Sequence, residues 1–187
     1  MKVLVMVDMQ NDFITGSLGT EEAEAIIPLV AEKLTRFDRN GLLIATMDKH
    51  NKALYSQSQE GRLLPVLHCV EGEWGAQMPK PIMEAFTGFP GDRYVFAKSE
   101  FGSVDLAMYL AELNTKDTIE EIELIGLCTD VCVVSNALLL KAFLPEVPIA
   151  VDASCCAGTT PENHAAALRT MRSCQIEIRN DESVVAR

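Results

Sequence analysis

The sequence predicts an α/β fold, a three-layer α/β/α arrangement around a mainly parallel, Rossmann-like sheet of six strands. Short, continuous apolar runs recur along the chain, and such runs are typical of strands that are covered on both faces. Segments with helical patterning separate most of these runs, and this alternation favours parallel strands joined by helical crossovers. The 187 residues, of which 48% are hydrophobic, are enough for one domain over residues 1–187 with a sizeable core.

Each predicted strand is a short apolar run. The runs are KVLVMV (2–7), LLIAT (42–46), YVFA (94–97), IEEIELI (119–125), PIAVD (148–152) and QIEIR (175–179). We expect helices at about 21–39, which Gly41 would end, at 103–114, at 130–143 and from Thr160 onward, where Thr160 and Pro161 are typical of a helix start. The segment 49–93 is rich in Gly, Pro and polar residues, and loops of that length are usually functional.

The charge and the cysteine content narrow the class of protein. A formal net charge of −11 argues against binding to nucleic acid or to an anionic membrane surface. The first apolar run is too short for a signal peptide and is interrupted by Asp8, and no run reaches the roughly 18 apolar residues of a membrane span. Six cysteines in a chain of this length do not suggest a disulfide scaffold. We therefore expect a protein of the reducing cytoplasm.

Polar side chains follow four of the predicted strands. Asp8 follows the first strand, Asp48 and His50 the second, Lys98 the third, and the turn 126–132 the fourth. Because the carboxyl ends of parallel strands meet at one edge of a sheet, and ligands bind there in open α/β folds, we expect these groups to converge. A carboxylate, an ammonium group, a thiol and a His/Asp pair at one edge are typical of a catalytic site.

Cys128 and Cys132 lie in an otherwise apolar segment, where cysteine is ordinarily a small buried packing residue. We expect Cys132 just inside a helix that follows the fourth strand, where the positive helix end favours a thiolate. Lys98 would add positive charge, and Asp8 could take the thiol proton. Cys128 lies at the turn, and its backbone N–H together with that of Cys132 could form an oxyanion hole.

Three blocks of the sequence resemble the isochorismatase-like cysteine hydrolases in pattern, order and spacing. They are VDMQNDF (7–13), KSEFGSVDL (98–106) and GLCTDVCV (126–133). The resemblance covers nearly the whole chain and implies a catalytic triad of Asp8, Lys98 and Cys132. It also implies a cis peptide bond between Leu127 and Cys128.

A second pattern, D-x-H followed by H-C-V-x-G, resembles the nicotinamidase metal motif. It supplies Asp48, His50 and His68, and two imidazoles with a carboxylate suit a divalent metal, with zinc the first candidate. The position where many nicotinamidases have a further histidine is Ser56 here. Glu60 resembles the carboxylate that some relatives use as an additional ligand. The aromatic residue that often precedes the second histidine is also absent, with leucine and proline at 64 and 65.

The resemblance implies an amidase that converts nicotinamide, and pyrazinamide, to the acid and ammonia through a Cys132 thioester. Phe13 and Phe101 would sandwich the substrate ring. The same chemistry on another small amide is the nearest alternative, and a non-catalytic metal- or thiol-binding protein is a remoter one. Relatives of this family are often oligomeric, so whether this chain forms a homo-oligomer is an open question. We expect His164 to lie away from the site, and Trp74 could line its entrance.

Overall fold

A computed structural model describes residues 1–181. Six strands form one sheet in the order β3-β2-β1-β4-β5-β6, and every neighbouring pair is parallel. The strands are β1 (Lys2–Val7), β2 (Leu42–Asp48), β3 (Arg93–Lys98), β4 (Glu121–Leu127), β5 (Ile149–Ala157) and β6 (Glu177–Arg179). The predicted α/β class with a six-stranded parallel sheet is confirmed.

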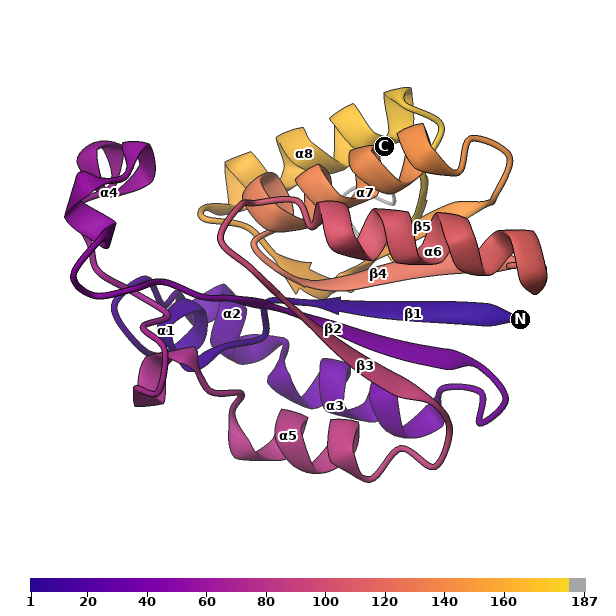
Figure 1. Ribbon diagram of the computed structural model, residues 1–187, viewed down its shortest axis with the longest axis horizontal. Helices are drawn as coiled ribbons and strands as arrows, with labels where there is room; N and C mark the ends of the chain where they lie inside the picture. Colours follow the sequence, from indigo (N-terminus) through magenta and orange to yellow (C-terminus); the bar gives the residue numbers. More distant parts are fainter. Residues whose placement is uncertain (182–187) are drawn as a thin grey trace.

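Helices cover both faces of the sheet, which gives the three layers (Figure 1). One face carries α6 (Val104–Lys116), α7 (Val134–Phe143) and α8 (Pro161–Ser173), and the other carries α2 (Glu21–Ala25), α3 (Ile27–Arg36) and α5 (Lys80–Thr87). Side chains alternate along a strand, so β1 contributes to two cores: Val3, Val5 and Val7 pack under α6–α8, and Leu4 and Met6 under α3 and α5. None of the helices within residues 1–181 combines the length and apolarity needed to cross a membrane.

The strand order reverses beside β1. From β1 the chain builds outward through β2 and β3 on one side, and then through β4, β5 and β6 on the other. In open parallel sheets the crevice beyond the carboxyl ends of the strands at such a reversal is where ligands bind. Here β4 leads into a π-helical turn, η3 (Thr129–Val133), which continues directly into α7.

The helix predicted over 21–39 is two helices, α2 and α3, separated at Ile26. Pro28 explains the break, because a proline has no N–H to continue the hydrogen-bond ladder of α2 but fits the first turn of a new helix. The prediction that Gly41 ends the helix is wrong. Helix α3 ends at Arg36, where Phe37 becomes extended and packs against Phe89 with ring centroids 5.7 Å apart.

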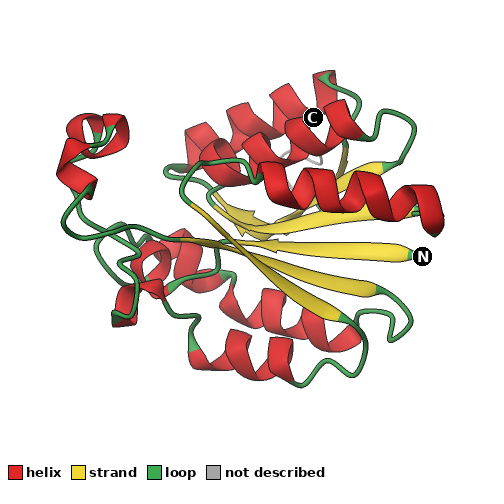
Figure 2. Cartoon of the chain, viewed as in Figure 1, coloured by secondary structure: helices red, strands yellow, loops and turns green. Residues whose placement is uncertain are grey.

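The segment 49–93 is not a loop throughout. Helix α5 packs against α3 and buries Ile82 and Phe86 in the core. Before it lie three short elements, η1 (Tyr55–Gln57), α4 (Gln59–Leu63) and η2 (Trp74–Ala76). Helix α4 projects away from the body of the protein at the carboxyl edge of the sheet, as Figure 2 shows. This projecting part carries residues of the candidate site.

Candidate active site

The structure brings Asp8, Lys98 and Cys132 together at the carboxyl ends of β1, β3 and β4. Lys98 Nζ lies 2.5 Å from Asp8 Oδ2 and 3.6 Å from Cys132 Sγ. All three residues are buried. The second carboxylate oxygen of Asp8 accepts a 2.7 Å hydrogen bond from the Thr46 hydroxyl. Asp8 has a φ of +46°, a conformation that is strained for a residue with a side chain and that occurs preferentially at functional sites.

Burial and neighbouring charges shift the pKa values of all three groups. It raises the pKa of Asp8, against the opposing influence of Lys98. Burial and the Asp8 charge raise the pKa of the Cys132 thiol well above its usual value. Burial alone would lower the pKa of Lys98, but Asp8 and Cys132 outweigh it and raise that pKa. The Cys132 thiol and the Asp8 carboxylate both contact Lys98, and the raised pKa of Asp8 makes this carboxylate a stronger base than an exposed aspartate.

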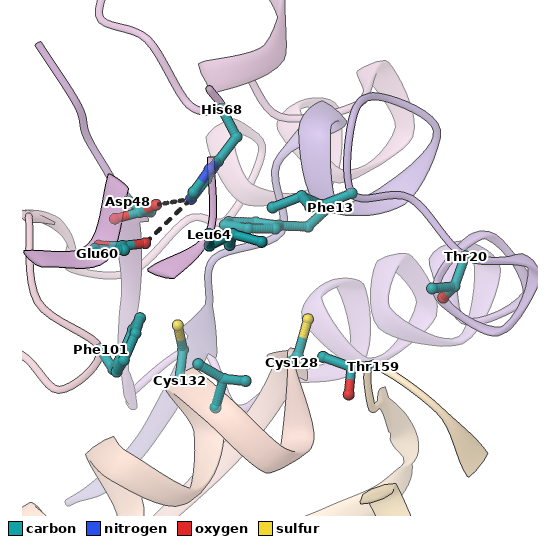
Figure 3. A pocket seen from close by; sticks show the side chains of 12 residues that line it. Phe13, Thr20, Asp48, Glu60, Leu64, His68, Phe101, Cys128, Cys132 and Thr159 are labelled. Atoms are coloured by element: carbon teal, nitrogen blue, oxygen red, sulfur yellow. Dashed lines mark ion pairs between the residues drawn. The ribbon is translucent and has the colours of Figure 1, made fainter. Parts of the chain in front are cut away.

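The turn that precedes the thiol is tightly constrained. The Leu127–Cys128 peptide bond is cis, as the resemblance implies. The Cys128 carbonyl accepts hydrogen bonds from the N–H groups of Val131 and Val133, each 3.0 Å long. The sulfur atoms of Cys128 and Cys132 both face the pocket (Figure 3). Burial raises the pKa of Cys128 to about 12, so this second thiol is neutral at physiological pH.

A cavity of about 280 Å³ lies in front of the thiols. Phe13 is 8% exposed and lies across the pocket from the nucleophile turn, beside Leu64. Phe101 is 49% exposed and lies close to Cys132 at the pocket edge. These apolar walls suit a flat aromatic ligand. The suggested place of Trp74 at the entrance is not supported, because its side chain is 57% exposed and does not line this cavity.

Four polar side chains gather at one end of the cavity. Asp48 Oδ2 lies 3.0 Å from His50 Nε2 and 3.3 Å from His68 Nε2. Glu60 Oε1 reaches in from α4 and lies 3.7 Å and 3.5 Å from the same two nitrogen atoms. The two imidazoles and Asp48 are buried, and Figure 3 shows the contacts from the His68 ring to both carboxylates as dashed lines. The pattern D-x-H followed by H therefore does assemble one cluster, and Glu60 joins it.

The donor atoms of this cluster fit a divalent metal ion. A tetrahedral ion with bonds of about 2.0–2.1 Å places its ligand atoms about 3.4 Å apart, and the separations between the carboxylate and imidazole atoms bracket that value. His50 Nε2 is buried and makes no hydrogen bond of acceptable geometry within the described part of the chain. His68 Nδ1 lies 2.8 Å from the Val66 carbonyl, and donation there would leave Nε2 free to bind a metal.

Three residues that position the site were not predicted from the sequence. The Gln10 side-chain amide, fully buried, donates to the Asp48 carbonyl at 2.8 Å and accepts from the Asp48 N–H at 2.7 Å. The Asp12 carboxylate accepts from the Cys69 N–H, next to His68, at 2.8 Å. Both lie in the block VDMQNDF (7–13), which was the available signal.

The third residue, Asn136, joins the nucleophile helix to the loop after β3. Its amide donates to the carbonyl oxygens of Cys132 at 2.8 Å and Phe101 at 3.1 Å, and its side-chain oxygen accepts from the Ser103 N–H at 2.9 Å. An asparagine inside an apolar helical segment was the signal in the sequence. Its three backbone partners fix Phe101 relative to the thiol.

The expectation that His164 lies away from the site is wrong. Its Nδ1 atom lies 2.8 Å from the hydroxyl oxygen of Thr129, the residue that follows Cys128. Burial lowers the pKa of His164, against the opposing charges of Asp181 and Asp130. Helix α8 crosses to the nucleophile turn in three dimensions, which sequence position alone did not reveal.

The sequence matches the isochorismatase domain model over residues 2–183. The chain belongs to the isochorismatase domain family. It is 29% identical to the nicotinamidase of Saccharomyces cerevisiae, an alignment that covers 74% of this chain and 80% of the relative. It is 27% identical to the nicotinamidase/pyrazinamidase of Mycobacterium tuberculosis, which covers 95% and 98% of the two chains. The family and these relatives indicate an amidohydrolase.

Solved structures agree in fold with this isochorismatase-family chain. The pyrazinamidase of Pyrococcus horikoshii, in complex with zinc, matches 95% of this chain and 97% of its own with a TM-score of 0.74 and 26% identity. The pyrazinamidase/nicotinamidase of Streptococcus mutans matches 95% and 99% with a TM-score of 0.82 and 22% identity. At 22% identity, the similarity to the Streptococcus mutans structure is evidence for the fold alone.

Proposed function

We propose that this amidohydrolase converts nicotinamide to nicotinate and ammonia, and pyrazinamide to its acid in the same way. One observation carries the proposal: Cys132, which belongs to the buried Asp8–Lys98–Cys132 group, lines the same small, apolar-walled cavity as three members of the donor cluster, Asp48, Glu60 and His68. The first could cleave an amide and the second could hold a pyridine nitrogen. The nicotinamidase relatives support this substrate class.

The cavity would bind the substrate by its ring. Phe13 and Phe101 would contact the two faces of the ring, and the ring nitrogen would point toward Asp48, His50 and His68, with Glu60 as the further ligand. A bound divalent ion, zinc in our proposal, would supply a Lewis-acidic position for that nitrogen. The zinc-bound Pyrococcus horikoshii structure supports this choice of metal. The carboxamide would then lie over the Cys132 sulfur.

Asp8 would start the reaction by taking the thiol proton of Cys132 as the sulfur attacks the amide carbon. The N–H groups of Cys128 and Cys132 would hold the negative oxygen of the tetrahedral intermediate. The protonated Asp8 would then give its proton to the amide nitrogen, so that ammonia leaves and a thioester remains. The raised pKa of Asp8 suits this exchange, because it makes the carboxylate a stronger base than an exposed aspartate.

Water would complete the reaction. Asp8 would deprotonate a water molecule as it attacks the thioester carbon, and Cys132 would leave as a thiolate that recovers the proton. Lys98 would stay cationic throughout, since its pKa is raised by Asp8 and Cys132. Its charge would offset the negative charge as it moves between the carboxylate and the sulfur.

The decisive experiment is ammonia release from nicotinamide by the purified protein. We expect Cys132→Ala to abolish turnover and a chelator to reduce it strongly, with activity restored by zinc. Cys174→Ala is the matched control, because that cysteine is exposed and outside the cavity, and it should keep full activity. A folded, metal-loaded protein that hydrolyses another small amide but not nicotinamide would contradict the substrate.

Three expectations from the sequence stay predictions. They are one domain over residues 1–187, of which the last six lie outside the described residues, a cytoplasmic location, and assembly into a homo-oligomer. Size-exclusion chromatography with light scattering would measure the last of these directly.

A further inference from the structure

The loop between β5 and α8 lies directly behind the nucleophile turn η3. His164 Nδ1 is 2.8 Å from Thr129 Oγ1. The Asp130 carboxylate accepts hydrogen bonds from the N–H and hydroxyl of Thr159, at 2.8 Å and 2.5 Å. Gly158 permits this close approach, because a Cβ atom there would lie 2.8 Å from the Cβ of His164. Two elements far apart in sequence are thus joined at three points.

Thr129 connects the β5–α8 loop and α8 to the turn that carries the Cys128 N–H. It is fully buried and follows Cys128, whose N–H is one of the two expected oxyanion donors. Its carbonyl accepts from the N–H of Val134, where α7 begins. The hydroxyl bond to His164 ties the same residue to α8. The backbone of Thr129 is therefore fixed by α7 and its side chain by α8.

We propose that His164 is a positioning residue for the oxyanion hole, acting through Thr129 on the turn that carries the Cys128 N–H. The inference rests on the proposed mechanism. His164 does not line the substrate cavity, so it would act on the donor and not on the substrate. Position matters here because an oxyanion donor must lie within about 2.7–3.1 Å of the developing charge, and a displacement of about 1 Å can cost about 100-fold in rate.

Two reactions of the Cys132 thiol distinguish a role in the oxyanion hole from a general contribution to the stability of the fold. When p-nitrophenyl acetate acylates Cys132, the sulfur bonds to the ester carbon, p-nitrophenolate leaves and the thiol proton passes to Asp8. That reaction passes through an oxyanion. Iodoacetamide alkylates the same sulfur by displacing iodide, and no oxyanion forms. Neither reagent depends on nicotinamide being the substrate.

The variants to compare are His164→Ala and Thr129→Val, which each remove the hydrogen bond, and His164→Asn and Thr129→Ser, which can keep it. We expect the first pair to slow acylation of Cys132 by about tenfold or more, with alkylation within twofold of wild type. The second pair should restore most of the acylation rate. Peptide mass spectrometry would assign each product to Cys132.

Thr160→Ala is the matched structural control. It removes the N-cap of α8, the hydroxyl that accepts from the Asn163 N–H at 3.1 Å, without touching Thr129. It should lower the melting temperature and leave the acylation rate within twofold. The inference is overturned if His164→Ala leaves acylation unchanged, or if it slows acylation and alkylation equally. Wild-type protein that is not acylated at Cys132 would instead contradict the proposed mechanism.

Discussion

Gly126 shows how strictly single residues are constrained beside the catalytic carboxylate. It has a φ of +115°, and an added Cβ would lie 2.1 Å from the carbonyl oxygen of Val7, the residue before Asp8. We expect Gly126→Ala to lower the free energy of unfolding by about 3 kcal/mol, since the backbone strain and the clash add. Chemical denaturation would measure the loss.

Gly72 provides the control for that prediction. Its φ is +81°, but an added Cβ would meet nothing within 4 Å. Gly72→Ala should therefore cost about 1 kcal/mol, from backbone strain alone. Equal losses at the two glycines would show that contact with β1 does not matter.

The residues that could be predicted from the sequence are those whose own side chains are reactive. Asp8, Lys98 and Cys132 are reactive side chains at strand ends, and parallel topology brings strand ends together. Gln10 and Asn136 could not be found in this way, because their partners are backbone groups of Asp48, Cys132 and other residues, whose positions exist only in the folded chain. The raised pKa of the Cys132 thiol was also beyond reach, since it follows from burial and from the Asp8 charge in the folded chain.

At the scale of elements, Gln10 joins the loop after β1 to the end of β2, where Asp48 supplies a candidate metal ligand. We expect Gln10→Met, which keeps the size but loses both hydrogen bonds to Asp48, to weaken zinc affinity by about 10- to 100-fold. Competition with a chromogenic chelator would measure this without reference to turnover.

Gln57→Met is the matched substitution for that experiment. Gln57 is exposed, lies in the same segment as the metal ligands, and donates a 3.2 Å hydrogen bond to the Ala53 carbonyl. Its zinc affinity should equal that of the wild type. If Gln10→Met also binds zinc as tightly as the wild type, Gln10 does not position Asp48.

Strand positions were more predictable than helix boundaries for a physical reason. All six strands were placed with limits within two residues, except that β5 continues five residues past its predicted end. Central strands such as β1 are covered on both faces and read as continuous apolar runs, whereas β3, at the edge of the sheet, is largely exposed. Helix limits depend on single residues such as Pro28, and on contacts such as that of Phe37 with Phe89. Helix α5 was missed because its burial comes from packing against α3, and eight residues give little periodicity.

At the scale of the whole molecule, a cluster of charges joins the helical layer to the sheet. Lys33 of α3 reaches Asp152 of β5 at 2.8 Å and Glu123 of β4 at 2.9 Å. Asn180 donates to the other oxygen of Asp152 at 3.0 Å. The Asp152 side chain is 3% exposed and that of Lys33 is 27% exposed. Because these contacts span three elements, they contribute to the stability of the fold as a unit.

The pKa shifts in this cluster set the pH range over which it stabilises the protein. Burial would raise the pKa of Asp152, but hydrogen bonds from Lys33, Asn180 and Ser154 outweigh it and hold that pKa below the usual value. A depressed folded pKa stabilises the fold above the unfolded value, near pH 4, and this contribution is lost as the pH falls through the folded value. Lys33 has a raised pKa, so its contribution is lost only in strong base.

We expect Asp152→Asn to lower the free energy of unfolding at pH 7 by about 2 kcal/mol. This is less than the loss for a fully buried pair, because Lys33 is partly exposed and keeps Glu123. The difference from wild type should narrow as the pH falls below about 4, because protonation of Asp152 removes the stabilising contribution of its charge. Denaturant titrations from pH 3 to pH 8 would measure this difference. Glu112→Gln is the control: it removes an exposed ion pair with Lys116, and its stability should match that of the wild type at every pH. A difference independent of pH would show that Asp152 acts through packing and not through its charge.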